Sequence, residues 1–256
     1  MKVPLNIAAV IIGRNEGERF LRCLASVKSQ VDVIVYVDSG STDGSIEAAV
    51  AGGADVVTLE TTRPFTAARA RNAGLERVLD IAPSTMMVQF IDGDCELQPG
   101  WISKSAAFLQ DHPKAAVACG RLRERFPEAS VYNWLLDAEW NTALGRVQAC
   151  GGIALMRVAA LKSTGSFNSD LIAGEEPELC VRLRADGWEV WRLDCEMALH
   201  DAAMMRFGQW WQRMRRGGYA FAEGMAMHGR PPERHCVKPM RRLLLWGILL
   251  PFTIVF

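Results

Sequence analysis

Residues 86–94 read MMVQFIDGD, an apolar run that stops at two aspartates separated by a glycine. A short apolar run that ends in turn residues predicts a buried strand, here Met86–Ile91. Asp92 and Asp94, placed on a tight glycine turn, can share a divalent cation, because carboxylate oxygens suit Mg²⁺ and Mn²⁺. An ordinary acidic turn is the alternative interpretation of the same three residues.

The same pattern occurs three times upstream of this strand. Each apolar, β-branched run is followed by turn residues and then by apolar positions at helical spacing. This alternation predicts an α/β fold with a mostly parallel central sheet and helices on both faces. Predicted strands are Leu5–Ile12, Val33–Val37 and Val56–Leu59; predicted helices are Glu16–Lys28, one from Ser45, and Thr66–Leu79 with Thr66 as its N-cap.

Polar clusters follow three of these strands, at Gly13–Glu16, Asp38–Asp43 and Asp92–Asp94. Ligands of open parallel sheets bind beyond the carboxyl ends of the strands. The clusters therefore predict a ligand site at one edge of the sheet.

After Gly100 the pattern is weaker. Glu175-Glu176-Pro177-Glu178 opens a helix that runs to about Ala185, with Pro177 as its predicted first residue and Glu176 predicted to be extended. A carboxylate held there can accept a proton from a hydroxyl, although simple helix capping is the alternative. Further predicted strands are Ala115–Cys119, Ile153–Met156 and Glu189–Leu193, and further predicted helices are Val131–Leu144 and Arg206–Met227.

Three more side chains are candidates for the site. Asp38 can accept a hydrogen bond from a base or ribose, or it can simply belong to a turn. Arg71 can pair with phosphate, whereas its neighbour Arg69 is better explained as a solvated helix position. His200 is either a structural histidine or a third metal ligand, and ligation requires it to fold back onto Asp94.

The C-terminal region differs from the rest of the chain. Net charge is zero, but residues 206–242 hold nine basic side chains against two acidic ones, a local charge of plus seven. Leu243–Phe256 is almost wholly apolar, which fits a truncated transmembrane helix, a re-entrant anchor or a buried helix. We therefore predict a domain of residues 1–203 and a basic, membrane-associated segment of residues 204–256. Scattered cysteines and the lack of a signal-peptide pattern favour the cytoplasm.

In order and spacing, five segments together resemble family 2 glycosyltransferases of the GT-A fold. The resemblance covers about residues 5–203. The segments are Ile11–Glu16, Val37–Gly44, Ala68–Gly74, Asp92–Asp94, and Gly174–Leu179 with Arg182–Arg184 and Gly187-Trp188.

The resemblance implies inverting, metal-dependent transfer of a hexose from a UDP- or GDP-linked donor to a saccharide or lipid-linked acceptor. From the arginines, Trp210 and Trp211 of the C-terminal segment we expect a membrane-bound acceptor, such as a polyprenyl-linked saccharide. We further expect cell-surface polysaccharide synthesis at the cytoplasmic face of the inner or plasma membrane, and no nucleic-acid partner. The metal, Mn²⁺ or Mg²⁺, is assigned to Asp94 and His200. The base is assigned to Glu176 or Glu175, because Glu stands where the family has Asp. Residues assigned to the nucleotide sugar are Arg14, Asn15, Glu16, Asp38, Arg71, Asp92, Gly151 and Gly152.

Two other functions compete with this one. A sugar nucleotidyltransferase also places nucleotides on a parallel sheet, but its glycine-rich, basic loop is replaced here by Gly13-Arg14-Asn15-Glu16, and Glu16 repels phosphate. A non-catalytic, membrane-associated relative is favoured by loss of Asp94 or of both glutamates, and all three acids are present.

Overall fold

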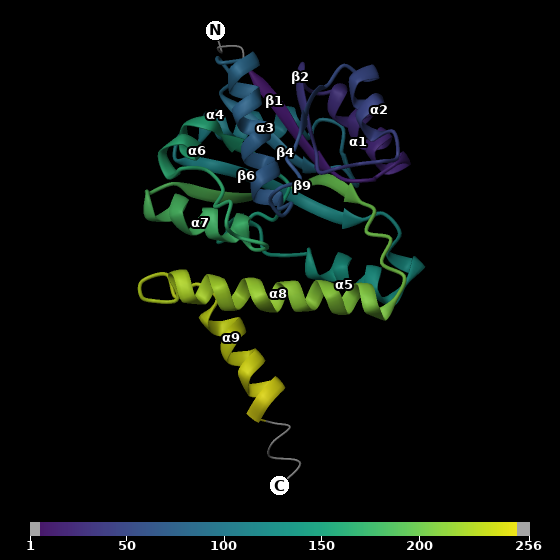
Figure 1. Ribbon diagram of the computed structural model, residues 1–256. Helices are drawn as coiled ribbons and strands as arrows, with labels where there is room; N and C mark the ends of the chain where they lie inside the picture. Colours follow the sequence, from purple (N-terminus) through teal and green to yellow (C-terminus); the bar gives the residue numbers. More distant parts are fainter. Residues whose placement is uncertain (1–5, 250–256) are drawn as a thin grey trace.

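The computed structural model describes residues 6–249 and is built on a nine-stranded sheet (Figure 1). Its strand order is β3-β2-β1-β4-β8-β6-β9-β5, with β7 paired to β9 outside this path. The strands are β1 (Ile7–Gly13), β2 (Val33–Asp38), β3 (Asp55–Thr58), β4 (Met87–Asp92), β5 (Cys95–Leu97), β6 (Ala115–Glu124), β7 (Gly145–Arg146), β8 (Ala154–Arg157) and β9 (Glu189–His200).

Helices cover both faces of the sheet, as two neighbouring residues of β4 show. Gln89 accepts a hydrogen bond from the indole of Trp101 on one face (2.8 Å), and Phe90 packs edge-on against Phe167 on the other (5.2 Å between ring centroids). Successive strand side chains point to opposite faces, so Trp101 and Phe167 lie in different layers. One layer holds α1 (Glu18–Lys28), α2 (Ser45–Ala51) and α4 (Trp101–Asp111), and the other holds α3 (Ala67–Ile81), α6 (Val158–Thr164) and α7 (Glu175–Ala185).

The parallel arrangement predicted for the first half of the chain is confirmed. β1 lies between β2 and β4 and is parallel to both, with Gly13 opposite Asp38 and Ile12 opposite Asp92. The polar clusters after these three strands therefore meet at one edge of the sheet, as the sequence predicts. The second half of the sheet is mixed, because β8 runs antiparallel to its neighbours β4 and β6.

The second half departs from the sequence prediction in element length. β6 continues to Glu124 and β9 to His200, whereas the helix predicted as Val131–Leu144 is α5 (Val131–Glu139). β5 and the helices α4 and α6 were not predicted. Leu5, the first residue of the first predicted strand, lies outside the described residues.

The predicted backbone of Glu176 is wrong. α7 begins at Glu175, so Glu176 is helical and Pro177 is the third helical residue rather than the first. Proline is tolerated there because the first N–H groups of a helix have no intrahelical acceptor. The Glu178 N–H donates to the Gly174 carbonyl (3.1 Å), which closes a helical turn around Glu176 despite the preference of a pre-proline residue for extended backbone.

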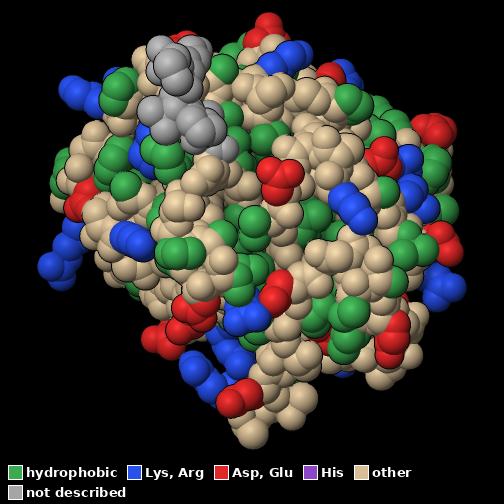
Figure 2. Space-filling view, turned by 90° about the horizontal axis from the view of Figure 1, so that it is seen from above, with side chains coloured by type: hydrophobic (Ala, Val, Ile, Leu, Met, Phe, Trp, Pro, Cys, Tyr) green, Lys and Arg blue, Asp and Glu red, His purple; other side chains and the backbone are tan. Residues whose placement is uncertain are grey.

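The C-terminal helices lie below the sheet in Figure 1. α8 (Phe207–His228) runs across the underside of the molecule, and α9 (Val237–Leu244) points away from it, followed by a π-helical turn, η2 (Leu245–Leu249); the short helix η1 (Pro127–Ala129) precedes α5. The opposite face, seen in Figure 2, carries charged side chains of both signs interspersed with apolar ones.

Three contacts fasten α8 to the rest of the molecule. Arg213 forms a two-pronged ion pair with Glu139 of α5 (2.9 Å for both bonds). His228 Nε2 lies 3.0 Å from Glu178 Oε1, and a Cβ on Gly174 would lie 3.0 Å from the Ala220 Cβ. α8 therefore packs directly against the first turn of α7.

Among residues 6–249, no helix has the length and apolar character needed to cross a membrane. Residues 250–256 of the apolar run Leu243–Phe256 lie outside the described residues. The domain boundary predicted after residue 203 falls in the connection between β9 and α8.

Candidate active site

The loops that follow β1 and β2 are fastened together by Asn15. Its side-chain Oδ1 accepts from the Thr42 N–H (2.7 Å), and its own N–H donates to Ser41 Oγ (3.0 Å). Asn15 has a φ of 55°, a left-handed conformation that asparagine tolerates better than most residues. The exposed Arg14 guanidinium lies over the Phe65 ring, 5.5 Å from its centroid. Asn15, Ser41 and Thr42 thus hold the two loops together where β1 and β2 end, beside Arg14 and Phe65.

Asp38 is fully buried and shapes its own loop. Its carboxylate accepts from the N–H groups of Gly40 and Ser41 (2.8 Å each) and from the Tyr36 hydroxyl (3.0 Å). The exposed fraction of Asp38 is 0%, so its side chain does not reach the surface at this edge of the sheet. Its immediate role is to hold the backbone of residues 40–41 in place.

Arg71 joins two of the predicted site residues. It lies on α3, whose first turn is capped by the Thr66 hydroxyl, and its side chain is 3% exposed. Nη2 donates to Asp92 Oδ1 (2.9 Å) and Nη1 to Glu175 Oε1 (2.5 Å). A buried guanidinium with two carboxylate partners is fixed in position, which suits it to hold phosphate oxygens at this edge.

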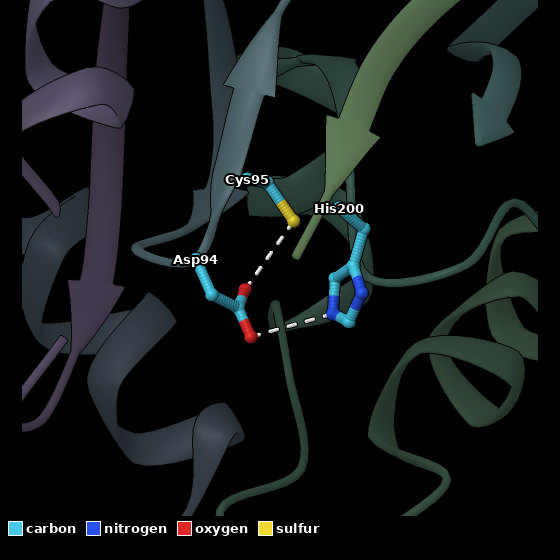
Figure 3. Close-up of side chains that lie close together, drawn as sticks. All are labelled: Asp94, Cys95 and His200. Carbon is cyan, nitrogen blue, oxygen red and sulfur yellow. Dashed lines mark hydrogen bonds and ion pairs between the residues drawn. The ribbon is translucent and has the colours of Figure 1, made fainter. Parts of the chain in front are cut away.

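His200 does fold back onto Asp94 (Figure 3). β9 pairs antiparallel with β5, which sets His200 opposite Cys95, and the Asp201 N–H donates to the Asp94 carbonyl (3.0 Å). The His200 Nε2 atom then lies 3.3 Å from Asp94 Oδ2. On its other side, Nδ1 lies 3.4 Å from the fully buried carboxylate of Glu124, which orients the ring.

The charges at this edge suit a divalent cation. Burial raises the pKa of Glu16, and the nearby Asp94 and Asp92 carboxylates add to the shift. Burial lowers the pKa of His200, but hydrogen bonds to Asp94 and Glu124 outweigh it and raise that pKa to about 10. Carboxylate oxygens with one imidazole are donors that fit Mn²⁺ or Mg²⁺, and His200 must release its proton before Nε2 can bind the ion. Burial raises the pKa of the adjacent Cys95 thiol, which therefore stays protonated and donates to Asp94 (3.3 Å).

Glu176 lines a separate cavity of about 320 Å³. Its Oε1 atom accepts from the Cys150 N–H (2.7 Å) and from the thiols of Cys150 and Cys180 (2.9 Å each). Its Oε2 atom has no hydrogen-bond donor among the described residues. Burial raises the pKa of Glu176. Other residues of the cavity wall include Trp140, Thr142, Gly151, Gly152 and Arg192.

Gly152 separates this cavity from the Arg71 cluster. A Cβ on Gly152 would lie 2.7 Å from Arg71 Nη2 and 3.3 Å from Asp92 Oδ2. Gly151 beside it has a φ of 79°, which favours glycine. A side chain at position 152 would therefore meet Arg71 and Asp92, and Gly152 brings these two residues close to the cavity that Glu176 lines.

The sequence did not reveal several of these neighbours. Glu124 stands among alternating arginines at the end of β6 and carries no local signal for its contact with His200. Trp140, whose ring lies edge-on to His200 (4.9 Å), follows a helix that ends earlier than predicted. Cys150 and Cys180 are 30 positions apart, and their common contact with Glu176 depends on tertiary folding.

Comparison with known proteins places this geometry in context. A family model described as Glycosyl transferase family 2 matches residues 8–163, more than half of the chain. A TPR repeat-containing protein of Synechococcus elongatus is 40% identical over 63 residues, which are 25% of this chain and 16% of that protein. The chain thus spans about a sixth of the length of this curated relative.

Two solved structures have the same architecture. The mannosyltransferase PcManGT from Pyrobaculum calidifontis, in complex with GDP-Man and Mn²⁺, has a TM-score of 0.67 at 21% identity; the match covers 92% of this chain and 67% of that chain. Glucosyl-3-phosphoglycerate synthase from Mycobacterium tuberculosis, in complex with Mn²⁺, UDP-Glc and phosphoglyceric acid, has a TM-score of 0.56 at 22% identity; the match covers 77% and 72%. These likenesses confirm the GT-A fold.

Proposed function

Because the chain belongs to glycosyl transferase family 2, we propose that it is an inverting hexosyltransferase. It moves a sugar from a nucleoside diphosphate to a hydroxyl of a saccharide or lipid-linked acceptor, and it depends on Mn²⁺ or Mg²⁺. The observation that carries this proposal is that Gly152 lies between Arg71, with its partners Asp92 and Glu175, and the cavity lined by Glu176. The Arg71 guanidinium suits a diphosphate, and the Glu176 carboxylate suits an acceptor hydroxyl.

The donor side is assigned to the ends of β1, β2 and β4. Arg14 and Asn15 flank the nucleotide, and Asp38 supports it through the backbone of residues 40–41. Arg71 holds the diphosphate by donating to its oxygens. Asp94 and His200, with Asp92 and Glu16 nearby, are the residues that would hold the cation, which supplies positive charge to stabilise the departing diphosphate. The solved relatives with GDP-Man or UDP-Glc and Mn²⁺ support a metal-bound sugar nucleotide here.

Glu176 is the better candidate for the base. Glu175 is engaged by Arg71, whereas Glu176 lines the cavity and its Oε2 atom accepts no hydrogen bond from a described residue. Oε2 takes the proton of the acceptor hydroxyl as the hydroxyl oxygen attacks the anomeric carbon. The bond to the diphosphate breaks on the opposite side, and the configuration inverts. Burial, which raises the pKa of Glu176, also makes this carboxylate a stronger base.

We place the acceptor at a membrane surface. α8 exposes the aromatic side chains of Phe207, Trp211 and Tyr219, and Leu243 and Leu244 of α9 and Leu245 and Trp246 of η2 are also exposed. Arg215, Arg216, Arg241 and Arg242 lie exposed among them. Aromatic and cationic side chains together favour binding to anionic lipid headgroups. This surface supports a lipid-linked acceptor, and we further propose that the reaction takes place at the cytoplasmic face of a membrane and serves polysaccharide synthesis.

Calorimetric titration of the full chain with UDP and with GDP, each with and without Mn²⁺, tests the proposal. We expect binding that requires Mn²⁺ and prefers one base. Folded protein that binds neither nucleotide would contradict the transferase and favour a non-catalytic relative. Detection of nucleotide sugar made from a sugar phosphate and a nucleoside triphosphate would instead indicate a sugar nucleotidyltransferase.

A further inference from the structure

Three potential metal ligands meet beside the cavity that Glu176 lines. The sulfur atoms of Cys150 and Cys180 are 3.9 Å apart, and each lies 2.9 Å from Glu176 Oε1. Glu176 and Cys180 are one turn apart on α7, and Cys150 comes from the loop before Gly151. Both cysteines are free, and these three ligand atoms lie within 4.8 Å of one another.

The spacing of the two sulfur atoms matches one bound zinc ion. Zinc–sulfur bonds of about 2.3 Å at a tetrahedral angle place two thiolate sulfurs about 3.8 Å apart. A carboxylate oxygen on the same ion lies about 3.5 Å from each sulfur, so the distance from Glu176 Oε1 to each sulfur must lengthen by about 0.6 Å.

We propose that Cys150, Glu176 and Cys180 form a second cation site, which takes a thiophilic divalent ion such as Zn²⁺ and thereby blocks Glu176. Both thiols release their protons to solvent as the sulfurs bind, and the fourth position of the ion faces the cavity. Two thiolates and a carboxylate select Zn²⁺ over Mn²⁺ and Mg²⁺, whereas the Asp94 site has no thiolate among its proposed ligands and also accepts Mn²⁺ or Mg²⁺. The inhibitory consequence rests on the proposed function of Glu176, but the binding of the ion does not.

An ion can reach the site through the cavity. Cys150 and Glu176 both contribute to the cavity wall, and Cys180 lies behind them with 0% exposure. A bound ion would be ligated by Glu176 and by Cys150. Cys150 precedes Gly151, which is assigned to the donor sugar. An ion bound at this site therefore prevents Glu176 from deprotonating an acceptor, and it leaves Arg71 and Asp94 unchanged.

Cobalt substitution tests the site directly. The full chain, kept reduced and supplied with excess Mg²⁺, is titrated with Co²⁺, and the sulfur-to-cobalt charge-transfer and visible tetrahedral absorption are recorded. We expect one equivalent of Co²⁺ to give both bands and Zn²⁺ to remove them. Cys150→Ser and Cys180→Ala should abolish the bands, whereas Cys236→Ser, at the half-buried start of α9, should leave them unchanged.

A second measurement needs no variant. In the unaltered protein, Zn²⁺ should protect Cys150 from iodoacetamide, as mapped by mass spectrometry, and leave alkylation of Cys195 and Cys236 unchanged. Zn²⁺ should also inhibit turnover, with a midpoint at least about tenfold higher in Cys180→Ala. Bands that persist in both cysteine variants, or alkylation of Cys150 unaffected by Zn²⁺, would overturn the site. Because neither spectroscopy nor alkylation requires turnover, failure of the transferase proposal is distinguishable from failure of this one.

Discussion

Glu175 and Glu176, adjacent in the chain, point into different surroundings. Glu175 Oε1 lies 2.5 Å from Arg71 Nη1, whereas Glu176 Oε1 accepts from the Cys150 N–H at 2.7 Å. The helical turn separates their side chains by about 100°, which follows from 3.6 residues per turn. One acid therefore supports the donor cluster and the other faces the cavity.

Replacement of Glu176 by Gln should lower kcat by about 10²- to 10⁴-fold, because the amide keeps an oxygen for the Cys150 N–H but cannot accept the acceptor's proton. Donor binding should stay near its original value. Glu175→Gln is the matched control and should mainly raise the donor KM, through Arg71. Steady-state kinetics with calorimetry separates these effects, and near-normal turnover in Glu176→Gln would refute the assignment.

Replacement of Asp94 by Asn should weaken Mn²⁺-dependent nucleotide binding by at least about tenfold, since the neutral amide is a poor ligand for a hard cation. The measurement is nucleotide affinity as a function of Mn²⁺ concentration. Asp111→Asn, on the exposed end of α4, is the control and should change nothing. A Mn²⁺ dependence identical to that of the original protein would remove Asp94 from the metal site.

Replacement of Gly74 by Ala should destabilise the fold by about 1–3 kcal/mol through overpacking. The added Cβ would lie 2.3 Å from Val10 Cγ1 and 3.0 Å from Val37 Cγ2, where α3 rests on the sheet. Gly218→Ala in α8 meets no atom within 4 Å and should stabilise its helix by up to about 1 kcal/mol. Urea denaturation of both variants provides the comparison; equal stabilities would contradict the close packing of α3.

The Asp55–Arg77 ion pair should stabilise the fold only above acidic pH. Two hydrogen bonds from Arg77 (2.7 and 2.8 Å) lower the pKa of Asp55 in the folded state. Its contribution is therefore present above the unfolded-state pKa of about 3.9 and is lost as pH falls through the lower folded-state value. For this partly exposed pair we expect Asp55→Asn to cost up to about 1 kcal/mol at neutral pH, with the difference shrinking toward zero in acid. A difference in unfolding free energy that grows on acidification would have the wrong sign.

Binding to anionic vesicles should depend on the exposed arginines of α8. Arg215→Gln with Arg216→Gln should weaken binding by roughly 30-fold, from about 1 kcal/mol per cation near the surface. Arg213→Gln is the control, because Arg213 is already paired with Glu139, and it should have a smaller effect. Co-sedimentation with anionic and neutral vesicles at two salt concentrations measures the fraction of protein bound. Equal binding to both vesicle types would exclude the electrostatic part of the proposal.

The elements before Asp94 could be predicted from the sequence because each carries its own local signal. The strand that ends at Asp92 and the helix capped by Thr66 depend on periodicity and on a side-chain cap, both visible in a short window. Their convergence at one sheet edge follows from parallel pairing alone. The residues assigned to the nucleotide could therefore be predicted from the sequence.

The other half of the site depends on contacts between distant segments. His200 reaches Asp94 only because β9 extends past its predicted end and pairs with a three-residue strand, β5. The Glu176 carboxylate is held by Cys150, which lies 26 positions away in the chain. No local pattern encodes either pairing.

The packing of Gly174 on Ala220 has an evolutionary consequence. A chimera that receives the C-terminal segment of another family member would inherit a new side chain at position 220, directly against the turn that opens α7. A side chain at position 174 would already meet the Ala220 Cβ at 3.0 Å, so the close approach of α8 to this turn depends on small residues at both positions. The segment is thus not an interchangeable module, and position 220 should covary with position 174.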